Sequence, residues 1–104
     1  MQLTRRLRRL RRSAAVRSLV RETHIHTSDL IYPMFVKEGE GIREPIDSMP
    51  GQFRFSVDQL VKECKEIWNL GIPAVNLFGY TVDKDDQATH SYDPNGLIQQ
   101  GIRA

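Results

Sequence analysis

One helix is marked at both of its ends in the sequence, and it limits the folds that this chain can form. Ser56 is a suitable N-cap, and Gln59 at the third helical position completes a capping box. Gly71 offers the left-handed residue that often follows a helix, and Pro73 prevents any continuation. The pattern therefore predicts a helix over residues 57–70. One face of this helix carries six apolar side chains at helical spacing, namely Val57, Leu60, Val61, Cys64, Ile67 and Trp68.

Apolar runs of strand length flank this helix. Residues 30–36 are apolar throughout, which is typical of a strand buried on both faces. Pro33 argues against a central strand, because it has no N–H to donate. Residues 74–79 form the second run, so the order predicts a βαβ unit with parallel strands and a right-handed crossover. Glycines and prolines between the first strand and the helix predict a loop with a turn at residues 49–51.

A further helix is expected near the end of the sequence. Asp93 is its predicted N-cap and Pro94 its first residue. An apolar face then begins with Leu97, Ile98 and Ile102. Two parallel strands cannot cover both faces of a buried sheet. We therefore expect this chain to be the N-terminal part of a larger α/β protein.

Charge is divided sharply along the chain. Residues 1–21 contain eight arginines and no acidic residue, whereas residues 22–104 contain seven basic residues and 13 acids, a net charge of −6. Such an arm is typical of nucleic-acid binding, of an organellar transit peptide, or of docking on an acidic partner surface, including a second copy. Ser13 is the expected N-cap of a short helix up to Arg21. Helical spacing also favours one apolar stripe of Leu3, Leu7, Leu10 and Ala14.

Spacing alone names no catalytic residue. His24 and His26 have the spacing of a metal-binding pair, but surface histidines are the better interpretation, because further ligands are lacking. The acidic run at residues 83–86 lacks the glycine and glutamate that an EF-hand needs. Cys64, as the single cysteine, excludes an intramolecular disulfide and is predicted to be a buried structural thiol. No apolar run reaches the length of a membrane span.

Five segments, in their order and spacing, carry a family resemblance. They are RRLRRSAAVRSLVRET, DLIYPMFVKEG, REPIDSMPG, LGIPAVNLFG and DPNGLIQQGIRA. Together they resemble the porphobilinogen synthase family, also called the delta-aminolevulinic acid dehydratases, over residues 5–104. The sequence departs from the family pattern at Thr89-His90-Ser91 and at Gly101, which costs a helix about 1 kcal/mol relative to alanine.

The resemblance implies an α/β fold that begins a TIM (β/α)8 barrel and is truncated after about two β/α units. Residues 1–28 would be a basic N-terminal arm with a short helix. Residues 29–104 would be the first strands and helices of the incomplete barrel. The family condenses two 5-aminolevulinate molecules to porphobilinogen, a hydro-lyase reaction of haem synthesis, through two Schiff-base lysines.

The resemblance also implies where the chemistry is not. The family's catalytic lysines and metal-binding cysteines lie beyond this segment, so we expect no catalytic residue, no bound zinc or magnesium, and no activity from these residues alone. None of the chain's four lysines matches the family's pair; they are Lys37, Lys62, Lys65 and Lys84. Phe78 is the one predicted substrate-binding residue, at the strand end where barrel active sites assemble. A core phenylalanine is the alternative.

The arm has a predicted partner as well. In the family such an arm wraps a neighbouring subunit and supports a homo-oligomer, commonly an octamer. The alternative, a small nucleic-acid-binding protein, would need aromatic or amide side chains among the arginines, and only Gln2 is present. An organellar protein would need a longer leader before the arm. We therefore expect a cytoplasmic protein that binds neither nucleic acid nor membrane.

Overall fold

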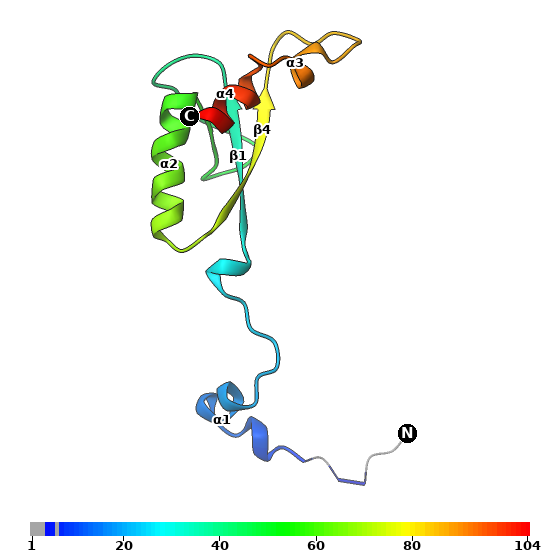
Figure 1. Ribbon diagram of the computed structural model, residues 1–104. Coiled ribbons are helices and arrows are strands. Elements are labelled where there is room, and N and C mark those ends of the chain that lie inside the picture. Colours follow the sequence, from blue (N-terminus) through cyan, green and yellow to red (C-terminus); the bar gives the residue numbers. More distant parts are fainter. Residues whose placement is uncertain (1–3, 6) are drawn as a thin grey trace.

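The computed structural model describes residues 4–5 and 7–104, which form an α/β body and an arm that extends away from it (Figure 1). The Cα radius of gyration is 21.7 Å, whereas a compact domain of this length has a radius of about 13 Å. The arm explains the difference. It contains a short 3-10 turn at Arg9–Arg11, helix α1 at Ala14–Leu19 and a second 3-10 turn at Thr27–Asp29.

The arm has the predicted cap but not the predicted stripe. The Ser13 hydroxyl accepts a hydrogen bond from the Val16 N–H, which confirms Ser13 as the N-cap of α1. Leu7 and Leu10 do not share a helix with Ala14, because the chain turns between them, and both leucines are exposed. Leu3 lies outside the described residues.

The body is built on a four-stranded sheet in the order β2-β3-β1-β4. Strands β1 (Ile31–Lys37) and β4 (Ala74–Tyr80) pair in parallel along their whole length. Helix α2 (Val57–Asn69) precedes β4 and packs on one face of the sheet (Figure 1). The predicted parallel βαβ unit is therefore confirmed.

A hairpin occupies the segment that was expected to be a loop. Strands β2 (Arg43–Pro45) and β3 (Phe53–Phe55) pair antiparallel, and the predicted turn lies between them, with Gly51 at φ +83°. Each strand has only three residues, so it is too short to show a periodic pattern in the sequence. β3 also pairs in parallel with β1, but only at Phe35 and Val36. Pro33 therefore lies in the half of β1 that β3 does not reach, so β1 is central in the sheet despite its proline.

Helix α2 ends as expected but begins differently. After the helix, the Gly71 N–H donates to the Trp68 carbonyl and the Ile72 N–H donates to the Ile67 carbonyl. Together with φ +85° at Gly71, these bonds make a Schellman motif. The predicted capping box is wrong, because the Ser56 hydroxyl makes no cap hydrogen bond to the helix backbone.

The core lies between the sheet and the helices that cover one of its faces. α2 and the last helix, α4 (Leu97–Arg103), both contact β1. The buried cluster that they enclose consists of Met34, Val36, Phe55, Leu60, Ile67 and Leu97. Trp68, at the edge of the apolar face of α2, is 67% exposed. The expectation of burial on both faces of β1 is wrong for these residues, because exposed or half-buried positions alternate with buried ones.

The C-terminal region contains two helices instead of one. Helix α3 (Thr89–Tyr92) precedes a turn, and α4 starts only after Gly96. Asp93 is therefore not an N-cap. Its carboxylate accepts the Asn95 N–H at 2.8 Å, and its carbonyl accepts the Gly96 N–H. These bonds hold residues 93–96 in a turn that delays the helix.

Candidate functional site

The sheet face opposite α2 carries aromatic and charged side chains near the carboxyl ends of β1 and β4. Because side chains alternate along a strand, Phe35 and Lys37 lie on the face opposite the buried Met34 and Val36. In β4, the same alternation places Phe78 and Tyr80 on this face. The strand register pairs Phe35 with Phe78 and Lys37 with Tyr80. We call Phe35, Lys37, Glu44, Arg54, Phe78 and Tyr80 the open-face cluster.

The aromatic half of the open-face cluster is a stacked pair. The Phe35 and Phe78 rings lie 5.6 Å apart between centroids, at an interplanar angle of 28°. Phe78 is 47% exposed, so this pair presents a flat apolar surface that the described residues leave open. Such a surface suits contact with a flat or apolar part of a ligand.

The charged half of the open-face cluster is centred on one carboxylate. Glu44 accepts hydrogen bonds from the Lys37 ammonium and, at 3.3 Å, from the Arg54 guanidinium. These are the two ion pairs within the part of the chain that the structure describes. The hydrogen bond from Lys37 and the positive charges of Lys37 and Arg54 lower the pKa of Glu44, which keeps it ionised. The Arg54 guanidinium also lies 4.5 Å from the centroid of the Tyr80 ring.

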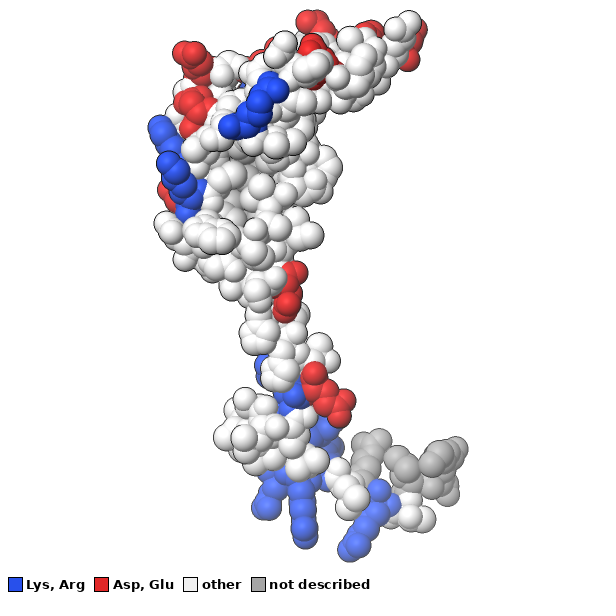
Figure 2. Space-filling view, in the orientation of Figure 1, with Lys and Arg blue, Asp and Glu red and all other residues white. Residues whose placement is uncertain are grey.

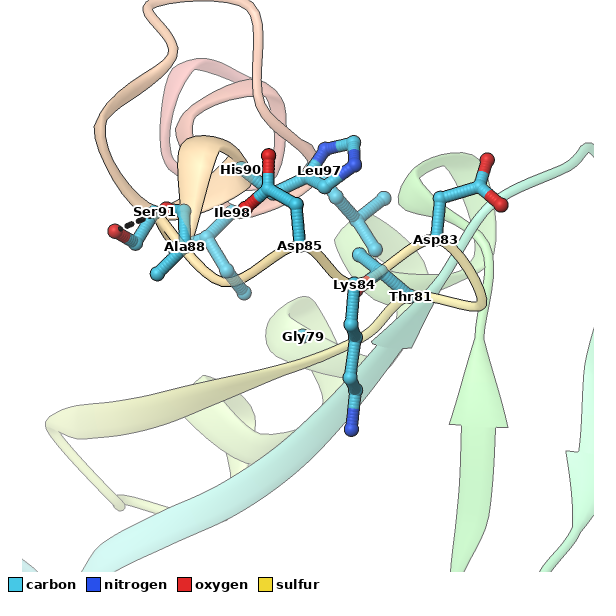
Figure 3. Close-up of a pocket in the computed structure, with 10 residues that line it drawn as sticks. All are labelled: Gly79, Thr81, Asp83, Lys84, Asp85, Ala88, His90, Ser91, Leu97 and Ile98. Carbon is cyan, nitrogen blue, oxygen red and sulfur yellow. Dashed lines mark hydrogen bonds between the residues drawn. The ribbon is translucent and has the colours of Figure 1, made fainter.

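A separate cavity of about 320 Å³ lies beyond the end of β4, between the following loop and the start of α4 (Figure 3). Asp83, Lys84, Asp85 and His90 line it together with smaller side chains. Figure 3 shows Lys84 extending away from His90, so the cavity does not bring these two groups together. Asp85 is committed to local structure, because its carboxylate accepts from both the N–H and the hydroxyl of Thr89. These bonds lower the pKa of Asp85.

The structure separates the residues that the sequence singled out. Phe78 lies in the open-face cluster, whereas the neighbouring Gly79 lines the cavity of Figure 3, close to Ile98. Lys62 and Lys65 lie exposed on α2. Cys64 is half-buried, 3.6 Å from the Met34 sulfur. Burial, with a smaller contribution from Glu63, raises the pKa of this thiol, which supports a structural role.

The histidine pair also remains without a metal-site partner. His24 and His26 stack with their ring centroids 6.1 Å apart, and both are exposed. Within residues 4–5 and 7–104, no three His, Cys, Asp or Glu side chains gather as a metal centre would require.

The charged half of the cluster was missed from the sequence. Glu44 and Arg54 lie on the hairpin that was expected to be a loop, so nothing indicated that they would meet β1. The sequence did carry one signal for the strand residues of the cluster. Phe35 and Lys37 are two residues apart, as are Phe78 and Tyr80, and residues at this spacing lie on the same face of a strand. That pattern was hidden because both strands are apolar on their other face too.

The surface of the arm is strongly basic. Figure 2 shows arginines gathered on the arm and many acidic side chains at the far end of the body. Every described arginine of residues 4–21 is exposed. Of the helices in the described part of the chain, none has the length and apolar character needed to cross a membrane.

Comparison with known proteins gives one consistent result. The family model described as delta-aminolevulinic acid dehydratase matches residues 4–104. The delta-aminolevulinic acid dehydratase of Halalkalibacterium halodurans is 53% identical over 96 residues, which are 92% of this chain and 29% of that protein. The one from Methanothermobacter thermautotrophicus is 49% identical over 102 residues, covering 96% of this chain and 31% of the relative.

A solved structure agrees with the sequence matches. The crystal structure of delta-aminolevulinic acid dehydratase from Toxoplasma gondii, in complex with the reaction product porphobilinogen, superposes with a TM-score of 0.83 at 43% identity. The match covers 96% of this chain and 29% of that one. The chain therefore spans about 30% of the length of the relatives that it matches.

Proposed function

Because this chain belongs to the delta-aminolevulinic acid dehydratase family, we propose that it forms the first part of an enzyme that condenses two 5-aminolevulinate molecules to porphobilinogen, with release of two waters. The match over residues 4–104 is the observation that carries the proposal. The fold is the α/β start of a TIM barrel, with β1 and β4 as parallel strands and α2 on the outer face. The nucleic-acid alternative has no comparable support.

We assign a binding role to the open-face cluster. In TIM barrels the helices surround the sheet, and active sites form at the carboxyl ends of the strands. The face opposite α2 is therefore the interior face of the barrel, and Phe78 lies at its carboxyl end. We propose that Phe78, stacked on Phe35, lines the substrate pocket. The Toxoplasma relative was solved with the product porphobilinogen bound.

This chain supplies binding surface and not the reacting amine. Schiff-base formation needs an unprotonated lysine that can reach a ketone. Lys37 is held by Glu44 as an ion pair. Lys62 and Lys65 lie on α2, on the side of the sheet opposite Phe78. Lys84 lies in the loop after β4. We therefore expect the family's Schiff-base lysines to lie outside these 104 residues.

The residues that the structure describes do not form a site that fits the zinc or magnesium of the family. A zinc or magnesium centre needs several ligating side chains at one point, and the described residues bring no such set together.

A chimera tests the function directly. We would replace the matching segment of the Halalkalibacterium enzyme, 53% identical to this chain, with residues 4–104. We expect the chimera to form porphobilinogen from 5-aminolevulinate, and the 104-residue chain alone to form none. The intact Halalkalibacterium enzyme is the positive control. A folded chimera without dehydratase activity would contradict the proposal.

We propose that the arm, residues 1–28, docks on another copy of the protein and supports a homo-oligomer such as an octamer. Its arginines complement the acidic residues 29–104, whose net charge is −5 from seven basic residues and 12 acids. Deletion of residues 4–12 from the chimera should lower its mass in solution, measured by light scattering. If the protein bound RNA with a nanomolar Kd at 150 mM salt, and this deletion abolished the binding, the result would favour the nucleic-acid alternative. A Kd of about 10⁻⁴–10⁻⁶ M would not, because any arginine-rich segment binds nucleic acid that strongly. Residues 29–104 would then be the barrel part, in a cytoplasmic enzyme.

A further inference from the structure

His90 lies between two cavities at the acidic end of the body. One is the cavity of about 320 Å³ shown in Figure 3. The other, of about 550 Å³, is lined by the loop after β1, the start of α2 and residues of α4. Carboxylates from four segments of the chain line these two cavities; they are Glu38, Glu40, Asp58, Asp83, Asp85 and Asp93. A histidine among them can change the local charge between about pH 5 and pH 8, a range in which ordinary carboxylates and lysines do not titrate.

The two lysines that line these cavities do not take the place of His90. The Lys37 ammonium already forms an ion pair in the open-face cluster. Figure 3 shows Lys84 on one side of the loop, and the His90 ring on the other side with the carboxylates of Asp83 and Asp85. His90 is therefore the cation that the carboxylates of this loop can share.

Two of the carboxylates around His90 keep their negative charge while a histidine titrates. Hydrogen bonds from Thr89 lower the pKa of Asp85, and the positive charge of His90 lowers it further. Hydrogen bonds, chiefly from the Ser56 hydroxyl, lower the pKa of Asp58 to about 2. Between about pH 5.5 and pH 8, a change of charge at this end of the body is therefore a change at His90.

The loop that follows β4 is held in an unfavourable conformation. Residues 83–93 contain four aspartates and one lysine, so their net charge is −3 while His90 is neutral. Ala88 has φ +52°, a left-handed conformation that is costly for an L-residue. Protonation of His90, which lies in α3, removes one unit of this negative charge and attracts the loop. Because the closed loop binds this proton more tightly than the released loop, acid pH favours the closed loop.

We propose that His90 is a pH-sensitive clamp on the loop of residues 81–88: when protonated it holds the loop against α3, and when neutral it releases the loop. The cavity in Figure 3 lies between this loop and α4. The clamp therefore opens this cavity as pH rises. The inference goes beyond the proposed function, because His90 lies in the segment where the sequence departs from the family pattern.

Hydrogen exchange in the full-length chimera tests the clamp and requires no turnover. The probes are the amides of Ala88, Thr89 and Ser91, each of which donates a hydrogen bond within this segment. The measured quantity is protection, which is the exchange rate of an unstructured peptide divided by that of the protein at the same pH. We expect protection to be about threefold higher at pH 5.5 than at pH 8, the scale of an exposed ion pair. In about 1 M salt this difference should disappear, because exposed charges are then screened.

Two substitutions of His90 separate its charge from its shape. His90→Lys keeps a positive charge at both pH values, so it should give the higher protection at both. His90→Gln carries no charge at either pH, so it should give the lower protection at both. His24→Gln is the matched control, because His24 is an exposed histidine of the arm, and it should keep the threefold difference.

The outcomes separate the clamp from the proposed function. A threefold difference that persists in His90→Gln would overturn the clamp, and so would low protection of His90→Lys at pH 8. If the chimera with either result is active, the proposed function stands. A folded but inactive chimera with the expected pattern would support the clamp and contradict the function. If the chimera does not fold, the same variants in a Halalkalibacterium enzyme that carries only residues 81–93 of this chain decide the question by the same criteria.

Discussion

At the scale of single residues, Ser56 joins two parts of the body that are distant in sequence. It is fully buried, and its hydroxyl accepts the Ile42 N–H at 2.9 Å and donates to the Asp58 carboxylate. Asp58 in turn accepts the Gly41 N–H at 3.1 Å. The sequence correctly placed Ser56 at the start of α2 but assigned its hydroxyl to the wrong partner. Local spacing cannot reveal a hydrogen bond to a loop 14 residues away.

The Asp58 contacts predict a specific dependence of stability on pH. The hydrogen bonds from Ser56 and Gly41 lower the pKa of Asp58 from 3.8 to about 2. Since the pKa is lower in the folded state, the stabilisation is present above pH 3.8 and is lost as pH falls towards about 2. In the chimera, Asp58→Asn should reduce the loss of stability across this window, measured by urea unfolding. Asp86→Asn, in the exposed loop, is the control and should leave the slope unchanged.

The proposed role of Phe78 in lining the substrate pocket can be tested by removal of its ring. Phe78→Leu keeps an apolar side chain but removes the flat ring from the open face. In the chimera we expect the KM for 5-aminolevulinate to rise about tenfold and the melting temperature to change little, since an aromatic pair contributes about 1 kcal/mol. Leu77→Ala is the contrast, because Leu77 packs against the core on the other face and should lower stability by about 2 kcal/mol. A Phe78 variant with unchanged KM and a lower melting temperature would make Phe78 a core residue.

At the scale of elements, the long ones were predictable from sequence and the short ones were not. α2, β1 and β4 each have enough residues to show a period or an apolar run, and their predicted parallel pairing is confirmed. The hairpin strands β2 and β3 have three residues each, and α3 has four, so no pattern could develop. The charged half of the candidate site could not be predicted either, because Glu44 and Arg54 lie on the hairpin that the sequence did not predict.

Helix α2 ends at a glycine whose backbone conformation other residues adopt only at a cost. Gly71 has φ +85° in the Schellman motif, a conformation that costs an L-residue about 1–2 kcal/mol. A Cβ there would also approach the Thr27 hydroxyl at 2.9 Å, although that hydroxyl can rotate away. Gly71→Ala should therefore destabilise the chimera by about 1–2 kcal/mol, measured by urea unfolding. Gly51→Ala is the matched control at φ +83° with nothing within 4 Å. A much larger loss at Gly71 would show that Thr27 cannot move.

At the scale of the whole molecule, the described residues expose more surface than a compact domain would. The accessible surface is 8862 Å², whereas a compact chain of 12 kDa has about 6,000 Å². Two features account for the excess: the extended arm and the uncovered face of the sheet. Ile31, for example, is 66% exposed on that face.

The uncovered face predicts weak folding of these residues by themselves. A small sheet with one bare face buries too little apolar surface to offset the entropy of ordering the chain. The purified 104-residue chain should show weak near-UV circular dichroism and no sharp thermal transition. The chimera, in which the rest of the barrel covers this face, is the control and should melt cooperatively. A sharp melt of the 104-residue chain as a monodisperse monomer would contradict this prediction.

The extended arm has a consequence for how stability responds to dilution. The described molecule measures 65 Å along its longest axis, and Figure 1 shows helix α1 and the chain before it stretched away from the body. We therefore expect the free energy that α1 and the preceding residues contribute to come from association with another molecule, which follows mass action. The melting temperature of the assembled protein should accordingly rise with the logarithm of its concentration, and removal of the arm should abolish that slope.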